Sequence, residues 1–600
     1  MKEGSEENSI CRVSFGNLNV FFLGHSVIPV MRGTKTVTSN SQGIKRKADC
    51  EEATATKKVS QVERCEKNTS INEAFAEIKT YQEGGIKQAA LTNALLFMIA
   101  TDDLPLSTSE KAGFKKFLQI AMPHYKPPSR KTVTTLLDSK YDTLSLKVKS
   151  DLVNLKSVSL TTDCWKENNT CRSYMGLTMH FWKDSSLQDI RLGCFPLDES
   201  HTSEYLGDEL LKLCDNWNIS KASIIAIVTD NAANISKAVK DKFSKSVHLP
   251  CFAHTLQLVP ERAMTSTTDL MNLIKSVKRI VTFFKQSTNV ADELRCLQVE
   301  SGKTEGTILK VKQEEKTRWN TTYYMVERFL FLAPIISSVL FQMRDGPQML
   351  QPCQIGMLTD VMQLLKPIEQ ATTKMCSEKT VLSSEIIPLI KCLSASINRK
   401  TPTTIVGIDL QLNLQNELKR RFEHIENVSL IAKACILDPR FKKLHFVSAL
   451  SAVQTISSLS QEMFSSDNSA LEDVVHLHPT NHPDSNDELW CLHEERSSSN
   501  LIDESEITDG IHNELKSYLR RKLIRRTSCP MQFWQRVKED YPIVYPIAMK
   551  YLSVPATSVP CERLFSKASM IDTPRKNRLT AEHLSRLIFL SGVSAENWGF

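Results

Sequence analysis

The chain has 600 residues, more than the roughly 250 to 300 at which a single hydrophobic core stops growing, so we expect several structural units. Its formal charge of +7 is small beside 75 basic and 68 acidic side chains, which permits contact with nucleic acid without requiring it. Sixteen cysteines include no Cys-x-x-Cys pair, which argues against a zinc ribbon or a disulfide scaffold and favours a reducing compartment. Gly24, His25 and Pro29 break the apolar run at 18–30, so we expect no membrane span.

Residues 1–70 are mostly polar and rich in Ser, Thr and Lys, a composition that predicts a disordered tail. Within them, Lys45-Arg46-Lys47 and Lys57-Lys58 are separated by nine residues, which is typical of a bipartite nuclear import signal. We therefore expect a nuclear protein, the alternative being a solvated tail that happens to contain lysines.

From 71 to 152 the apolar residues recur every three or four positions, as in Phe75, Ile78 and Tyr81, which predicts a helical domain. The run ends at a basic, proline-containing stretch that includes Arg130 and Lys131. Cations near phosphate supply most non-specific affinity for DNA, so these two residues are candidate DNA contacts. The alternative is an ordinary solvated loop.

The period changes to two at Ser157, which predicts strands at 157–165, 174–182 and 190–197. A helix with an N-cap at Thr202 or Ser203 follows, and then a continuous apolar run at 224–229 that is typical of a strand buried on both faces. This order predicts an α/β, ribonuclease-H-like core beginning within 153–264, in which the first and fourth strands lie side by side. Asp163 and Asp230 would then stand at their ends.

Residues 265–464 carry helical patterns and no strand signal, so we expect a large all-helical insertion in the α/β core, the alternative being a separate helical domain. Residues 465–513 hold twelve acidic residues against Arg496 alone, which predicts a disordered acidic loop. The tract also holds side chains of types that could bind zinc, but their spacing fits no closed zinc site: His476, His478, His482, Cys491 and His493. The alternative to a disordered acidic loop without a function is that the acidic tract shields a nearby basic surface.

Residues 514–600 begin with a basic helix and become apolar and helical. The stretch Thr557 to Ser566 reads Thr-Ser-Val-Pro-Cys-Glu-Arg-Leu-Phe-Ser, and a proline just after Thr and Ser predicts a helix start there. Glu562 falls in the first turn of this helix, where the helix dipole favours any acidic side chain.

Five blocks in this order resemble the hAT superfamily of transposases and the BED-finger proteins descended from them. The similar segments are Leu-Thr-Thr-Asp-Cys-Trp around Asp163, Val-Thr-Asp-Asn-Ala-Ala-Asn around Asp230, Cys-Phe-Ala-His-Thr-Leu at 251–256, Thr-Arg-Trp-Asn at 317–320 and the stretch around Glu562. The resemblance covers residues 71 to 600. It implies DNA as a partner and self-association through a C-terminal dimerisation region at 514–600 that also completes the core.

The resemblance further implies that Asp163, Asp230 and Glu562 are a catalytic triad that holds Mg²⁺ or Mn²⁺ for DNA cleavage and strand transfer. Phosphodiester transfer by two hard cations needs carboxylate ligands of this kind. Read singly, the two aspartates are equally explained as turn formers at strand ends. By the same resemblance His254, Arg318 and Trp319 are candidate DNA contacts, with Trp319 either stacked on an unpaired base or buried at a helix start.

The sequence departs from this family at its beginning, because residues 1–70 offer only Cys11, Cys50, Cys65 and His25 where a BED finger needs a short-spaced Cys pair and a His pair. Two functions therefore compete. The first is a metal-dependent transposase, and the second is a domesticated, non-catalytic DNA-binding regulator of transcription. The intact acidic triad favours the first, and the missing finger favours the second.

Overall fold

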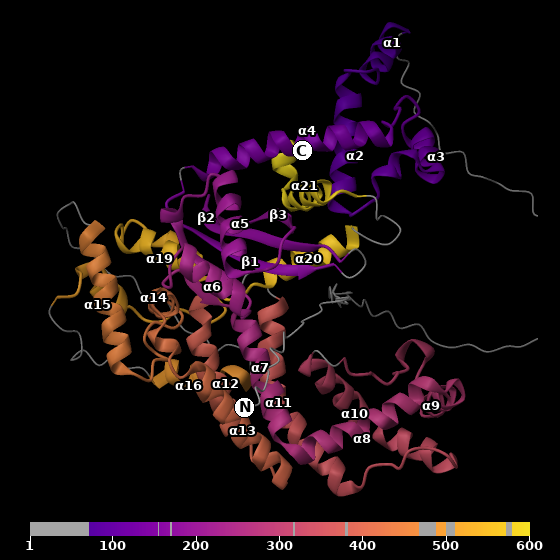
Figure 1. Ribbon diagram of the computed structural model, residues 1–600, viewed down its shortest axis with the longest axis vertical. Coiled ribbons are helices and arrows are strands. Elements are labelled where there is room, and N and C mark those ends of the chain that lie inside the picture. Colours follow the sequence, from indigo (N-terminus) through magenta and orange to yellow (C-terminus); the bar gives the residue numbers. More distant parts are fainter. Residues whose placement is uncertain are drawn as a thin grey trace, which may run out of the picture.

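The computed structural model describes residues 71–153, 155–167, 171–315, 318–377, 382–466, 488–499, 510–571 and 579–600. The expected tail at 1–70, with its import signal, lies outside the described residues. So does most of the expected acidic loop. The described chain is mixed α/β, with one sheet surrounded by helices and a large helical region beside it (Figure 1).

A single five-stranded sheet lies at the centre of the upper part of Figure 1. Its order is β3-β2-β1-β4-β5, and β1 runs antiparallel to β2 but parallel to β4. The predicted pairing of the first and fourth strands is therefore confirmed, with Thr161 of β1 opposite Val228 of β4. The strand bounds are β1 Val158–Lys166, β2 Ser173–Lys183, β3 Ser186–Leu197, β4 Ile224–Thr229 and β5 His248–Pro250.

The sheet is covered by helices from distant parts of the chain. Helix α5 (Ser203–Asn216) begins where the sequence predicts, because the Thr202 side chain accepts a hydrogen bond from the Tyr205 backbone. Helix α6 (Ala233–Lys242) follows β4, and α20 (Val559–Ile571) and α21 (Ala581–Gly592) return from the C-terminal end to pack on the strands. The sheet is thus completed only by the last part of the chain.

The N-terminal helices form their own projection at the top of Figure 1 and are linked to the sheet by the long helix α4. Arg130 and Lys131 belong to the first turn of α4 and not to the preceding loop, because Ser129 caps this helix by accepting from the Thr132 backbone at 3.2 Å. The bounds are α1 Ile71–Thr80, α2 Ile86–Thr101, α3 Ala112–Ala121 and α4 Arg130–Leu152, with a 3₁₀ turn at Leu106–Glu110.

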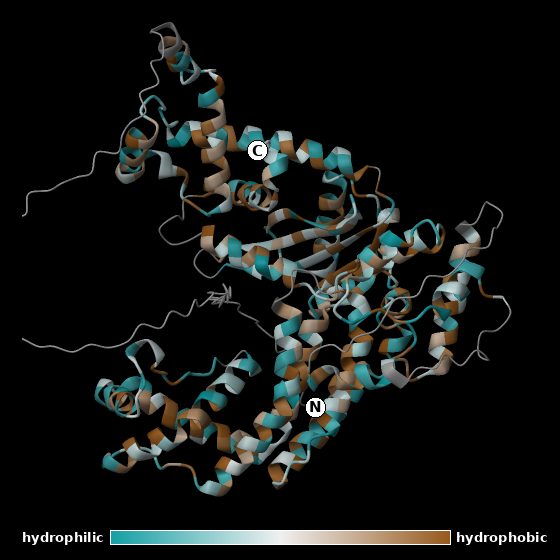
Figure 2. Ribbon diagram, turned by 180° about the vertical axis from the view of Figure 1, so that it is seen from behind, coloured by the Kyte–Doolittle hydropathy of each residue, from teal (hydrophilic) through white to brown (hydrophobic). Residues whose placement is uncertain are grey.

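The described residues between 265 and 464 are helical without a strand, as the sequence predicts. Most of these helices are amphipathic, and Figure 2 shows hydrophilic and hydrophobic residues alternating along them. The bounds here are α7 Phe252–Ser266, α8 Thr268–Gln286, α9 Thr288–Glu300, α10 Trp319–Gln342, α11 Pro352–Ser377, α12 Ile386–Asn398, α13 Ile405–Phe422, α14 Ser429–Leu437 and α15 Ala449–Ser466.

Helix α10 is the one helix in the described part of the chain that is long and apolar enough to cross a membrane. Its residues Phe329, Leu332 and Ile336 are fully buried, and it packs against α8, α9 and α11. These contacts are those of a core helix in a helical bundle, so α10 gives no reason to place the chain in a membrane.

Two hydrophobic cores divide the described chain. The first joins the sheet and N-terminal helices with α20 and α21, whereas the second runs from β4 through the helical region to Ala556. The remaining helices are α16 Cys491–Ser499, α17 Asn513–Arg520, α18 Pro530–Arg536, α19 Val544–Leu552 and α22 Ala595–Trp598.

Residues 488–499 differ from the expected disordered loop. They form a 3₁₀ turn at Glu488–Trp490 followed by α16, and Leu489 and Trp490 are buried in the second core. Burial of Leu489 and Trp490 offsets the conformational entropy lost when this segment becomes ordered. The acidic tract as a whole has too few apolar residues to do so.

Candidate active site

Asp163 and Asp230 lie at corresponding points of two adjacent parallel strands. Asp163 is on β1 opposite Gly176, and Asp230 directly follows β4. Each stands two residues beyond the paired residues Thr161 and Val228, so the parallel register brings the two carboxylates to the same level of the sheet.

The charges at this edge of the sheet repel one another. Asp163 is 6% exposed, and burial raises its pKa well above the usual value, with further increases from the negative charges of Asp230 and Glu562. Burial also raises the pKa of Asp230, against the opposing effects of the Ala232 N–H and of His254. Burial and the neighbouring carboxylates therefore both disfavour ionisation of Asp163.

Both aspartates also make local backbone contacts. An Asp163 carboxylate oxygen accepts from the Cys164 N–H at 2.7 Å, and an Asp230 oxygen accepts from the Ala232 N–H at 3.2 Å. The second contact is a turn of the kind that Asp forms at strand ends, so Asp230 has a structural role whether or not it binds a ligand.

Glu562 comes near Asp163 because α20 is held against β1. The Cys561 thiol donates to the Thr161 carbonyl oxygen at 3.0 Å, which fixes the first turn of α20 beside the strand that carries Asp163. The preceding segment is fixed as well, since the Phe252 N–H donates to the Ala556 carbonyl at 3.0 Å and the Ser558 N–H contacts the Cys251 sulfur at 3.2 Å.

His254 lies in the first turn of α7 and contacts the same group of acids. Its Nε2 is 3.6 Å from a Glu562 carboxylate oxygen. Burial opposes protonation of the ring, but the Cys251 sulfur, Glu562 and Asp163 together raise the pKa of His254 to about 10. His254 is therefore a cation at neutral pH.

The carboxylates suit a magnesium or manganese ion by their chemistry, but they do not form a closed ligand set. Among the described residues no group of three or more His, Cys, Asp or Glu side chains is arranged to hold a metal ion. Mg²⁺ commonly binds through one or two carboxylates, with water and substrate phosphate completing the shell, and the repelling pair Asp163 and Asp230 fits that mode. Glu562 is instead directed at His254.

The Trp319 ring is buried, so it is not available to stack on a base in this conformation. The ring is 4% exposed at the start of α10 and packs edge-on against Tyr323, with the ring centres 6.3 Å apart. The alternative of a buried helix-start tryptophan therefore describes this conformation. Arg318, next to it, lies near the end of α11, where its charge and that of Glu562 both act on the Cys376 thiol.

Arg130 and Lys131 are not brought to the carboxylates. Both side chains are exposed on α4 in the N-terminal projection, and the Arg130 N–H donates to Glu110 of the preceding 3₁₀ turn at 2.7 Å. Any DNA contact made by these residues is thus separate from the acidic site.

Three neighbours of the site were not singled out as site residues from the sequence: Cys251, Cys561 and Arg563. Arg563 donates to the Cys376 carbonyl at 2.7 Å and so lies beside Glu562 at the end of α11. All three stand within the motifs that carry Glu562 and His254, and that adjacency was the only available signal.

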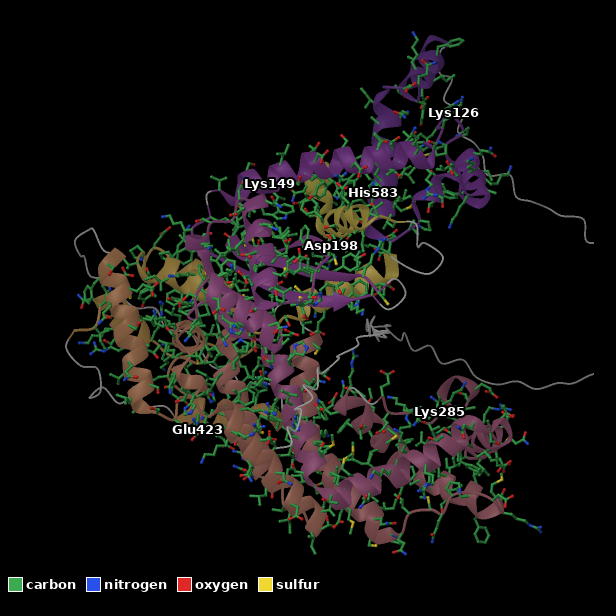
Figure 3. The ribbon with its side chains drawn as sticks, viewed as in Figure 1. Lys126, Lys149, Asp198, Lys285, Glu423 and His583 are labelled. Carbon is green, nitrogen blue, oxygen red and sulfur yellow. The ribbon has the colours of Figure 1, made fainter. Side chains whose placement is uncertain are left out.

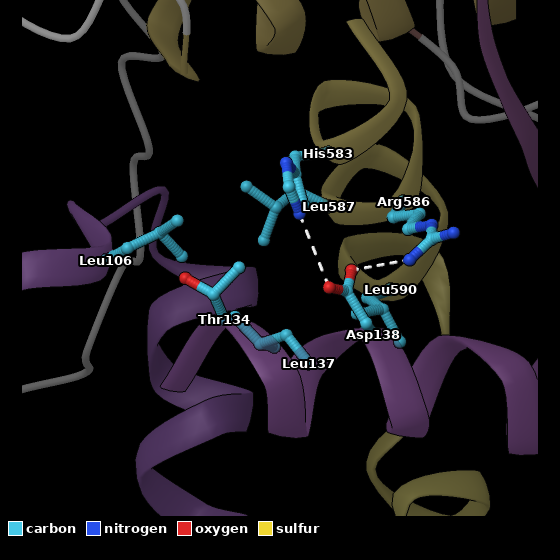
Figure 4. A pocket seen from close by; sticks show the side chains of 8 residues that line it. All are labelled: Leu106, Thr134, Leu137, Asp138, His583, Arg586, Leu587 and Leu590. Carbon is cyan, nitrogen blue, oxygen red and sulfur yellow. Dashed lines mark hydrogen bonds and ion pairs between the residues drawn. The ribbon is translucent and has the colours of Figure 1, made fainter. Parts of the chain in front are cut away.

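A small cavity between α4 and α21 does not compete as the site. Its volume is about 10 Å³, room for about one water molecule. Asp138 of α4 is paired there with Arg586 of α21 at 2.7 Å and lies 3.3 Å from His583 Nε2 of the same helix (Figure 4). These contacts join the N-terminal helical part to the C-terminal part of the chain.

Two family models match separate parts of the chain. Residues 514–592 match the hAT family C-terminal dimerisation region, and residues 249–347 match the ZBED1 RNase-like helical domain. The first match covers most of α17 to α21, which contribute to both cores, and the second includes His254, Arg318 and Trp319. These two segments of the chain are therefore similar to hAT transposase-like and ZBED1-like proteins.

Individual relatives agree with this class. Zinc finger BED domain-containing protein 4 of Homo sapiens is 25% identical over 528 residues, which is 83% of this chain and 43% of that protein. Zinc finger BED domain-containing protein 6 of Homo sapiens is 25% identical over 83% of this chain and 55% of its own length. The Hobo transposase of Drosophila melanogaster is 26% identical over 42% of this chain and 39% of that protein.

The chain spans about half the length of the curated relatives it matches. Together with the motifs, the matches identify a protein derived from the hAT and ZBED lineage, as the sequence blocks predict.

Proposed function

We propose that this chain is a nuclear, hAT-transposase-like protein that binds DNA, self-associates through residues 514–600 and carries a metal-dependent DNA-cleaving site. In this proposal the sheet is a ribonuclease-H-like core within 153–264, interrupted by the helical region and completed by α20. The parallel pairing of β1 and β4, and the return of α20 to pack on β1 and β2, support that reading.

The observation that carries the proposal is the position of Asp163 and Asp230 at one level of adjacent parallel strands, with Glu562 close enough to raise the Asp163 pKa. Asp163 and Asp230 would hold Mg²⁺ or Mn²⁺. Such an ion activates an attacking oxygen and stabilises a leaving oxygen during phosphodiester transfer.

The other residues of the site would orient the DNA. Protonated His254 carries a positive charge beside Glu562, and Arg318 and Arg563 add cations around the end of α11, so a phosphate group is attracted to the edge where the aspartates stand. Glu562 keeps His254 charged and oriented through their contact.

The test is a nicking and strand-joining assay on DNA with Mg²⁺ or Mn²⁺, comparing the natural chain with Asp163→Asn and Asp230→Asn. Both variants should lose activity by at least about a hundredfold, since a removed ligand removes most of the ion's contribution. Asp198→Asn is the matched control, because Asp198 is exposed at the end of β3 (Figure 3). Cleavage that survives in both site variants would rule out this centre.

The second candidate is a domesticated, non-catalytic DNA-binding regulator. The absence of a three-ligand metal group from the described residues favours it. It predicts salt-sensitive DNA binding and self-association with no metal-dependent cleavage in the natural chain. The same assay therefore separates the two functions, and the subcellular position of a fluorescent fusion tests the nuclear assignment for both.

A further inference from the structure

The acidic side chains of residues 488–499 contact cations of the helical region. Three of their carboxylates are paired with cations elsewhere: Glu488 with Lys400, Glu495 with Arg399, and Glu494 with Arg526 at 3.5 Å. Two of these cations follow α12, and Arg526 precedes α18, so one short segment neutralises positive charge gathered from two distant parts of the chain.

A buried tryptophan fastens the same segment. Trp490 is 1% exposed and stacks on Phe441 with the ring centres 6.0 Å apart. The Lys374 ammonium lies 4.7 Å from the centre of its ring and the Arg526 guanidinium 5.1 Å from it. Ion pairs near a protein surface add little stability, so the apolar contacts hold the segment while the carboxylates determine the charge that the surface presents.

A concave surface adjoins this segment. A cavity of about 950 Å³ is lined by Trp490 and by the cations Lys374, Arg440 and Arg526, together with hydroxyl groups of Thr527 and Ser528. Glu369 and Glu385 also line it, and Glu385 is paired with Lys374 and Arg440. The cavity therefore combines cations and hydroxyl donors beside Trp490, the residue that anchors the acidic segment.

We propose that Arg399, Lys400 and Arg526 form a phosphate-binding surface for the backbone of a nucleic acid, and that Glu488, Glu494 and Glu495 occupy this surface in cis. The segment acts as an internal competitor that weakens binding. The inference rests on the proposed DNA binding and adds a regulated surface distinct from the carboxylate site.

The chemistry favours a phosphodiester backbone as the occupant. Guanidinium and ammonium groups that pair with carboxylates use the same charge-assisted hydrogen bonds for phosphate oxygens. The basic stretch around Arg526 continues this supply of charge, since Arg520, Lys522 and Arg525 are exposed. A line of singly charged groups with adjacent hydroxyl donors suits repeated phosphates better than one compact anion.

The experiment measures affinity for a DNA duplex of about 30 base pairs as a function of salt, because each phosphate contact adds about 0.9 to the slope of log affinity against log salt. The test variant is Glu488→Gln, Glu494→Gln and Glu495→Gln in the full chain. Its slope should be steeper than that of the natural chain by roughly 2 to 3, as three cations become available.

The matched control removes the same negative charge elsewhere, with Asp292→Asn, Glu300→Gln and Glu423→Gln, all exposed on other helices or at their ends (Figure 3 labels Glu423). Adding Arg399→Gln and Lys400→Gln to the test variant should return the slope toward its natural value. Thermal unfolding of each variant checks that the chain still folds.

The outcomes separate this inference from the proposed function. If the natural chain binds DNA and the test variant matches the control, the cis-occupied surface is wrong and DNA binding stands. If only the test variant binds, the inference is supported and DNA binding by the natural chain is refuted. If neither chain binds, both are overturned.

Discussion

The Cys561 thiol donates a hydrogen bond to the carbonyl oxygen of Thr161 at 3.0 Å, across 400 residues of sequence. Thr161 stands two positions before Asp163 on β1, and Cys561 immediately precedes Glu562 on α20. The contact therefore sets the distance between two of the acids on which the proposed chemistry depends.

Replacing Cys561 with alanine should loosen this attachment. The change removes a buried sulfur and its hydrogen bond, at a cost of about 1 to 2 kcal/mol. Hydrogen exchange in α20 should increase and the urea midpoint of the sheet core should fall. Cys353→Ala is the control, since Cys353 is exposed and its loss should change stability by less than about 0.5 kcal/mol. Equal effects of the two changes would contradict the assigned role of Cys561.

Gly176 tests the same contact from the other strand. A Cβ atom added there would lie 2.7 Å from the Phe565 ring of α20, so Gly176→Ala should push the helix away and destabilise the protein by about 1 to 3 kcal/mol. Gly356→Ala in α11 meets no atom within 4 Å and should be neutral or stabilising by up to about 1 kcal/mol. The comparison needs only thermal unfolding of the two variants, and a tolerated Gly176→Ala would show that α20 does not sit against β2 at this point.

Asp163→Asn should stabilise the metal-free protein. The pKa of Asp163 is raised by burial and then by Asp230, so its ionised form lowers stability as pH rises above the ordinary carboxyl pKa. The variant should therefore be more stable than the natural chain at neutral pH, and the difference should disappear at a pH low enough to protonate Asp163 in both states. Added Mg²⁺ should raise the melting temperature of the natural chain and not that of the variant. A melting temperature of the natural chain that ignores Mg²⁺ and Mn²⁺ would count against the ion site.

His254 should make stability depend on alkaline pH. The pKa of His254 in the folded chain is about 10, above its ordinary 6.5, so the stability from its protonation is fully present below about 6.5 and is lost as pH rises through 10. The difference in unfolding free energy between the natural chain and His254→Gln should therefore shrink between these values. A constant difference across that range would mean that His254 is neutral in the folded protein.

Arg440 supports the helical region through buried charge. Its guanidinium lies 2.7 Å from Asp438 and 3.4 Å from Glu385, and all three side chains are buried. Arg440→Met would leave the buried Asp438 carboxylate without its cation and Glu385 with Lys374 alone, and the expected loss is about 3 to 5 kcal/mol in urea unfolding. The exposed Arg344→Met should change stability by less than about 0.5 kcal/mol.

Periodicity predicted the strands at 157–165 and 224–229. The order of these elements, read as the opening of a ribonuclease-H-like fold, predicted that the first and fourth strands lie side by side with Asp163 and Asp230 at their ends. The position of Glu562 could not be predicted in this way, because it depends on the contact between Cys561 and Thr161, which are 400 residues apart in sequence. Only the family resemblance linked Glu562 to the aspartates.

The remaining differences have local causes. Composition averaged over 465–513 concealed Leu489 and Trp490, whose burial orders residues 488–499. Trp319 carried two interpretations that the sequence could not separate, because a helix-start tryptophan faces either solvent or core according to its neighbours, here Tyr323. Ser129 capped α4 one residue before Arg130, which moved two basic residues from a loop onto a helix.

The hydrogen bond between the Phe252 N–H and the Ala556 carbonyl joins the points where the chain leaves the sheet for the helical region and where it returns. His254 lies just beyond one side of this bond and Glu562 just beyond the other. The His254 and Glu562 pair therefore lies across the junction at which the chain leaves the sheet and returns to it, so the spacing of this pair depends on how that junction is closed.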